Sequence, residues 1–190
     1  ILKETGEIVD NCQKRSQRLF EERELSVDEC AGYLQKAINL LKSQTVASGS
    51  SEGTLKVIIT VSPIRYAKYG YHGSQLSKAT LLLAADKLVK ENPGVVSYFP
   101  AYEIMNDELR DYRFYKEDML HPSEQAVEYI WERFRATYFG KAAEQFLEDW
   151  RPIREALGHK PFHPESEEHQ KFIARTEEKK RQFEEKYHLL

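Results

Sequence analysis

The stretch Leu55-Lys56-Val57-Ile58-Ile59-Thr60-Val61 carries the strongest fold signal in the sequence. It is a nearly unbroken run of β-branched residues, which is typical of a strand buried on both faces of a parallel sheet. A second run of this kind occupies residues 95–99, and a helical pattern lies between the two at about residues 74–90. Strand, helix and strand joined by short links predict a βαβ unit, and therefore an α/β fold.

Helical signals surround this unit. Ser26-Val27-Asp28-Glu29 fits a capping box and predicts a helix from there to about residue 43. Its expected buried stripe is Val27, Ala31, Leu34, Ile38 and Leu41. We also expect a short helix at residues 101–109 and a longer one after residue 123. Near the start, residues 2–5 and 7–10 predict two short extended pieces about a turn at Gly6.

Composition limits the class of protein. The chain has 190 residues, of which 41% are hydrophobic, and this suits one globular domain with a core of its own. The net charge of -3, from 28 basic and 31 acidic residues, gives no reason to expect nucleic acid as a partner. No apolar run is long enough to span a bilayer. Cys12 and Cys30 cannot form a disulfide framework, and we favour two reduced thiols over a single bridge.

The sequence changes character after Gly140. Residues 142–157 are helical with an expected interruption at Pro152, and residues 165–188 form a highly charged helical pattern with few apolar positions. We therefore assign residues 1–139 to the α/β domain and residues 140–190 to a helical extension. The histidines His159, His163 and His169 match no common ligand spacing, so no metal site is expected.

The main candidate for chemistry is Asp118-Met119-Leu120-His121-Pro122-Ser123, just before the predicted helix. Ser123 or His121 can cap that helix, which places the pair on the loop that enters it. A carboxylate three residues from a histidine can hold one imidazole nitrogen and leave the other free, as a hydrolase requires of its general base. The alternative is a structural hydrogen bond that only braces the loop.

The loop after residue 61 is rich in aromatic and basic side chains. In open α/β sheets, ligand clefts lie at the carboxyl ends of the strands. We therefore expect this loop to line one wall of a cleft, through Arg65, Tyr66, Lys68, Tyr69, Tyr71 and His72.

Several strings, taken together, resemble the GSCFA-domain family over essentially the whole chain. They are VIITVSP (57–63), LSKATLLLA (76–84), YFPAYEI (98–104), LRDYRFY (109–115) and DMLHPS (118–123), with LKETGEIV (2–9) and KPFHPES (160–166) at the two ends. GSCFA domains are similar to the SGNH (GDSL-type) hydrolases, which act mostly on esters of lipids, carbohydrates or other acyl carriers. The resemblance implies their three-layer α/β/α, flavodoxin-like fold with a parallel sheet.

The resemblance also implies roles for two residues. The last SGNH motif supplies an Asp and a His three residues apart, and Asp118 and His121 match it. His121 would then activate a serine, and Asp118 would orient the imidazole. The Gly-Ser-Cys-Phe-Ala motif that holds the presumed nucleophile does not occur in these residues, and Arg65-Tyr66 departs from the family's usual Arg-His.

The expected function follows from these points. We interpret the chain as the C-terminal part of a serine hydrolase domain for small-molecule, carbohydrate or acyl esters, inactive without the N-terminal half that carries the nucleophile. One alternative is a non-catalytic SGNH-like module that binds a glycan or an acyl group. Another is a helical interaction domain, although the strand at residues 55–61 argues against it. No cofactor is implied, and a homo-oligomer is left open.

Overall fold

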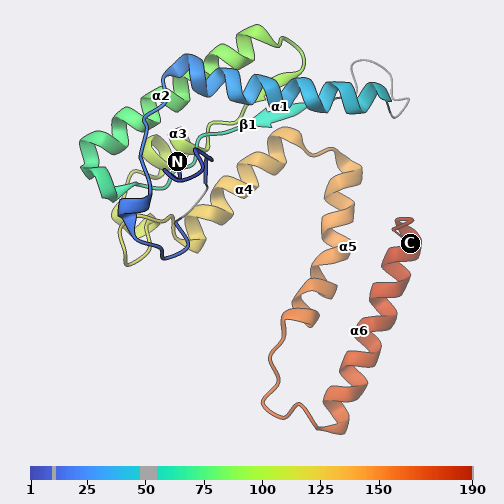
Figure 1. The fold of residues 1–190 in the computed structure, drawn as a ribbon. Helices are drawn as coiled ribbons and strands as arrows, with labels where there is room; N and C mark the ends of the chain where they lie inside the picture. Colours follow the sequence, from blue (N-terminus) through green and yellow to red (C-terminus); the bar gives the residue numbers. More distant parts are fainter. Residues whose placement is uncertain (10–11, 48–54, 190) are drawn as a thin grey trace. The chain divides into compact units, whose positions relative to one another are not determined.

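The computed structural model describes residues 1–9, 12–47 and 55–189. They form two compact units, Ile1–Ile130 and Trp131–Leu190, which we describe separately (Figure 1). None of the helices in the described ranges has the length and apolar content needed to cross a membrane.

The first unit is built on two parallel strands. Strands β1 (Val57–Ile59) and β2 (Val96–Tyr98) pair with Val57 opposite Val96, and helix α2 (Gly70–Glu91) connects them. The Val57 amide donates to Val95 O and the Phe99 amide to Ile59 O, so the ladder extends just past both strands. The predicted βαβ unit and α/β class are therefore confirmed, with strands shorter than the sequence pattern indicated.

Helices cover one face of this small sheet. Val57 and Ile59 point toward α2 and α1 (Val27–Ala47), and these elements share one core. Its buried members are Ala31, Ile38, Ala84, Leu88 and Val96. On the opposite face Ile58 is 40% exposed, so the prediction that this strand is buried on both faces is wrong. Successive strand side chains alternate between faces, so the face that carries Ile58 is the less covered of the two.

Helix α1 begins at the predicted capping box. The Ser26 amide donates to Glu29 Oε2 (2.9 Å) and the Glu29 amide to Ser26 Oγ (3.2 Å). Val27 is partly buried, and Ala31 and Ile38 are buried as expected.

The other two residues of the predicted stripe on α1 are not buried. Leu34 and Leu41 are 44% and 45% exposed. The helix is rotated so that Gln35 and Lys42 reach the buried Asn92 at the end of α2, with their amide and ammonium groups 3.2 and 3.3 Å from its Oδ1. Gln35 and Lys42 therefore take the partly buried positions that the sequence pattern assigned to Leu34 and Leu41.

The amino-terminal segment contains the predicted turn and gains a second backbone partner. Gly6 has φ +71°, in the left-handed region that glycine tolerates, and its amide donates to Leu2 O. The Leu2 amide donates to Glu7 O (2.8 Å) across this turn, and Leu2 also pairs antiparallel with Phe20, which follows the short helix η1 (Gln17–Leu19). Two backbone hydrogen bonds flank this pair. The Lys3 amide donates to Leu19 O, and the Glu21 amide donates to Ile1 O. Residue 10 lies outside the described residues.

The chain after β2 forms a second cluster in the same unit. It contains α3 (Ala101–Glu103), the π-helical η3 (Ile104–Leu109), the 3-10 turn η4 (Tyr112–Phe114) and the first half of α4 (Glu124–Tyr138), whose residues from Trp131 on belong to the second unit. The buried residues of this cluster are Met105, Leu109, Phe114, Tyr115 and Ala126. A helix at residues 101–109 is confirmed, and Arg110, with φ +46°, ends it.

The second unit contains two packed helices, α5 (Lys141–Gly158) and α6 (Glu167–Lys186). Aromatic rings join them: the Phe183 ring of α6 lies 4.9 Å from Phe146 and 5.1 Å from Trp150 of α5. The predicted interruption of α5 at Pro152 is wrong, since the helix continues through it. Trp150, whose ring contacts Phe183, and the buried Ile153 flank the proline in sequence, so both halves of the helix have an inward-facing residue.

We predict that Leu88→Ala lowers the free energy of unfolding by roughly 2–5 kcal/mol, because Leu88 is completely buried and its truncation leaves a cavity. Leu83→Ala on the same helix is the matched control. Leu83 is 58% exposed, and we expect a change within about 0.5 kcal/mol. Denaturant unfolding of the three proteins measures both values. Equal losses in the two variants would contradict the core described here.

Candidate functional site

Backbone hydrogen bonds fold residues 114–123 into a tight loop. The Ser123 amide donates to Phe114 O (2.7 Å) and the Lys116 amide to His121 O (2.8 Å). Met119, near the tip, has φ +60°, an uncommon left-handed conformation for a residue with a side chain. The loop is thus held from both ends.

This loop brings Asp118 and His121 into direct contact. Asp118 Oδ1 accepts the amides of Leu120 (2.9 Å) and His121 (3.0 Å), and Oδ2 lies 2.6 Å from His121 Nδ1. One carboxylate therefore organises the loop backbone and orients the imidazole. The spacing of three residues had indicated this contact.

The charge on Asp118 selects which imidazole nitrogen of His121 carries the proton of their hydrogen bond. Hydrogen bonds from the His121 amide, the Leu120 amide and the imidazole, in that order, lower the pKa of Asp118 from 3.8 to about 2. The carboxylate is ionised at neutral pH, so Nδ1 acts as the donor, and in the tautomer that this selects Nε2 carries the free lone pair. The His121 side chain is 53% exposed, and no described residue hydrogen-bonds its Nε2. The arrangement can take a proton from an incoming group.

Ser123, and not His121, caps the helix that follows. Its Oγ accepts the Ala126 amide (3.3 Å), and its carbonyl accepts the Val127 amide (3.0 Å). His121 is consequently free of any capping role.

The loop after β1 lies against the Asp118–His121 loop. The Arg65 amide donates to Leu120 O (3.0 Å). On its other side this loop is fastened to α2, because the Tyr66 amide donates to Ser74 Oγ (3.1 Å) and Lys78 Nζ to Ser62 O (2.5 Å). Of the residues predicted to line a cleft wall, Arg65 is thus the one whose backbone contacts the Asp118–His121 loop.

The two residues that anchor this wall, Ser74 and Lys78, were missed at the level of sequence. Lys78 is only 7% exposed, and burial lowers its pKa. A signal was present, because Ser74 and Lys78 lie four residues apart and so on one face of the helix, the same face that Ala85 continues.

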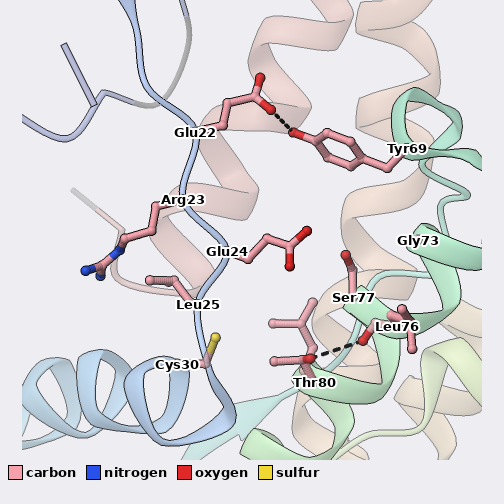
Figure 2. A pocket seen from close by; sticks show the side chains of 11 residues that line it. Glu22, Arg23, Glu24, Leu25, Cys30, Tyr69, Gly73, Leu76, Ser77 and Thr80 are labelled. Carbon is pink, nitrogen blue, oxygen red and sulfur yellow. Dashed lines mark hydrogen bonds between the residues drawn. The ribbon is translucent and has the colours of Figure 1, made fainter. Parts of the chain in front are cut away.

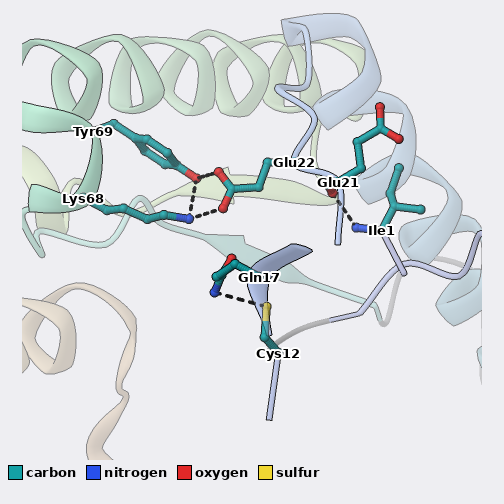
Figure 3. A network of polar contacts seen from close by, with 7 residues as sticks. All are labelled: Ile1, Cys12, Gln17, Glu21, Glu22, Lys68 and Tyr69. Atoms are coloured by element: carbon teal, nitrogen blue, oxygen red, sulfur yellow. Dashed lines mark hydrogen bonds and ion pairs between the residues drawn. The ribbon is translucent and has the colours of Figure 1, made fainter. Parts of the chain in front are cut away.

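Lys68 and Tyr69 face a different part of the molecule. Both side chains bind the Glu22 carboxylate, and the Tyr69 hydroxyl donates at 2.5 Å (Figure 3). Lys68 first and Tyr69 second lower the pKa of Glu22. These two residues of the predicted wall therefore fix the amino-terminal segment to η2 (Ala67–Tyr69), while Tyr71 and His72 are exposed at the start of α2.

A cavity of about 450 Å³ lies between residues 22–25 and α2 (Figure 2). The Glu24 carboxylate points toward Ser77, whereas the Arg23 side chain points away from the cavity. Arg23 pairs with Glu29 instead (3.1 Å). No histidine is among the described residues that line it, so these residues offer no imidazole base, and Asp118 and His121 are not among them.

Fold and site define an α/β protein with a preorganised Asp–His pair beside the carboxyl end of its sheet. A model of the GSCFA family matches residues 1–134, and a model described as GSCFA domain protein, C-terminal domain, matches residues 150–190. The chain belongs to the GSCFA family, as the sequence strings predicted. No curated protein and no solved structure matches it.

We predict that Asp118 titrates with a pKa of about 2 in the folded chain and near 3.8 after unfolding in urea. Because the folded pKa is the lower one, its contribution to stability is present above pH 3.8 and disappears as the pH falls through about 2. NMR titration of the carboxyl carbon measures both values.

His121→Gln separates the causes of this shift. The two backbone donors remain, so we expect the pKa of Asp118 to rise but to stay below 3.8. A return to the unfolded value would mean that the imidazole, and not the backbone, holds the carboxylate.

Proposed function

We propose that His121 is the general base, and Asp118 the carboxylate that orients it, in a serine hydrolase that acts on ester or acyl substrates. The observation that supports this most directly is the 2.6 Å contact between Asp118 Oδ2 and His121 Nδ1, with Nε2 unoccupied by described residues. This is the relation between carboxylate and imidazole that Ser-His-Asp catalysis uses.

The proposed chemistry proceeds in two steps. His121 Nε2 takes the proton of a serine hydroxyl as its oxygen attacks the ester carbonyl, and then returns that proton to the leaving alcohol. Water, deprotonated by the same nitrogen, next attacks the acyl-serine; the imidazolium returns that proton to the serine oxygen as the acid leaves. Asp118 stabilises the imidazolium formed in each step and is not itself protonated, in keeping with its low pKa.

We place the nucleophile outside these 190 residues. No described serine hydrogen-bonds His121, and Ser123 is used as a helix cap. The same proposal includes the three-layer SGNH-like fold, with further elements over the exposed Ile58 face, and the assignment of residues 1–139 to that domain and 140–190 to a helical extension.

A second candidate is a non-catalytic module that binds a glycan or an acyl group. The observation in its favour is the row of exposed rings after β1, Tyr66, Tyr69 and Tyr71, because exposed aromatic faces stack on sugars. In this case the Asp118–His121 contact would only brace the loop.

Labelling with a fluorophosphonate probe tests the proposal. We expect the full-length polypeptide that carries these residues to be labelled, and His121→Ala to lose labelling by about a hundredfold or more, since a serine without its base is a weak nucleophile. The 190-residue chain alone should not react.

His163→Ala is the matched control, because His163 is an exposed histidine in the second unit, and it should be labelled at the normal rate. If the folded full-length polypeptide stays unlabelled, or if His121→Ala reacts as fast as the control, the hydrolase proposal fails and the binding module takes its place.

A further inference from the structure

A second cavity, of about 160 Å³, lies beside the Asp118–His121 loop. Its walls come from the loop after β1, from η3 and from the segment that follows η3. The π-helical form of η3 is notable here, since such turns are rare and occur frequently at functional sites. The side chains on which the argument depends are Arg65, Arg110, Asp111, Tyr112 and Tyr115.

The Arg65 guanidinium lies against two aromatic rings. Its Cζ lies 4.0 Å from the ring centroid of Tyr115 and 5.4 Å from that of Tyr112. A stacked guanidinium presents its N–H donors at its edge, away from the rings. No acceptor among the described residues bonds to this side chain. Arg65 is thus a half-buried, oriented cation whose donors are all available.

The charge of the cavity favours an anion. Arg110 is a second cation on the wall, and its side chain has no ion pair within the described ranges. Asp111 is the only acidic residue among the described lining residues. Its Oδ1 accepts the Arg113 amide (2.9 Å) and so caps η4. Two guanidinium groups and one carboxylate leave the lining with a net charge of +1.

The cavity walls are bonded to the neighbours of His121 on both sides. The Arg65 amide donates to Leu120 O, and Tyr115 pairs antiparallel with Pro122. A group bound in the cavity is therefore held by residues whose positions are coupled to that of the imidazole.

We propose that this cavity binds an oxyanion, a carboxylate or a phosphate, carried by the substrate on which His121 acts. The link to hydrolysis rests on the proposed function, whereas the anion site does not. Pockets for whole ligands usually measure about 300–1,000 Å³, so a cavity of about 160 Å³ suits a charged head group and not an acyl chain. Arg65 can hold either oxyanion through two parallel N–H donors.

NMR titration of the ¹⁵N-labelled chain with sodium phosphate, and separately with sodium acetate, tests this site at constant ionic strength. We expect saturable shifts of the Arg65 Nε–H and Leu120 amide signals. Arg65→Met should weaken binding by about tenfold or more, because it removes charge-assisted hydrogen bonds. Arg65→Lys should lie between the two, since it keeps the charge but loses the paired donors.

Arg113→Met is the matched control. Arg113 also stacks on an aromatic ring, that of Phe114 at 4.8 Å, but it does not line the cavity, so the affinity should change less than twofold. Arg110→Met gives a second loss of binding that does not disturb the Arg65 stack. Tighter binding of phosphate would assign phosphate-bearing substrates, and tighter binding of acetate would assign carboxylates.

The site is refuted if neither anion shifts the Arg65 signal, or if folded Arg65→Met binds within twofold of the unmodified chain. No ester is present in this experiment. An unlabelled, inactive full-length polypeptide would therefore disprove the hydrolase without affecting the binding result, and a failed titration would leave the hydrolase standing.

Discussion

The parallel pairing of β1 with β2 is the constraint on which the rest of the first unit depends. Parallel strands need a crossover helix, and α2 fills that role while using its two ends differently. Its carboxyl half contributes Leu88 to the core, and its amino half uses Ser74 and Lys78 to hold the loop after β1. That loop in turn reaches the Asp118–His121 loop through Arg65 and Leu120. The position of the imidazole is therefore connected, bond by bond, to the sheet.

The Asp118–His121 loop is stabilised by hydrogen bonds among its own residues. Left-handed backbone at Met119 costs about 1–2 kcal/mol, and the three N–H groups that converge on one carboxylate offset this cost. Because backbone amides supply the two largest contributions to the low pKa, Asp118 stays ionised whether or not the imidazole is charged. A base that gains and loses a proton needs such a partner, since the orienting charge must not change during the cycle.

The sequence predicted those features that depend on short stretches of chain. The β-branched run at residues 55–61, the capping box at Ser26 and the Asp–His spacing are each decided within a few residues, and the structure contains the corresponding elements. It did not predict the rotation of α1, because this depends on Asn92, 57 residues away from Gln35. The exposure of Ile58 was missed for a related reason: a buried run does not say which neighbours are present to bury it. Lys78 was missed because the acceptor it meets is a backbone carbonyl, which no residue type marks in the sequence.

Arg65 combines two roles that depend on different parts of the residue. Its amide fixes the loop that carries His121, and any residue except proline can supply that hydrogen bond. Its guanidinium, placed by Tyr115, faces the cavity and depends entirely on the side chain. The positioning of the base and the selection of a charged substrate group can therefore vary independently at one position. By contrast, Lys68 and Tyr69, only three and four residues further on, are engaged by Glu22 and contribute to neither role. Of the basic residues that follow β1, the one nearest the strand is thus the one coupled to the candidate site.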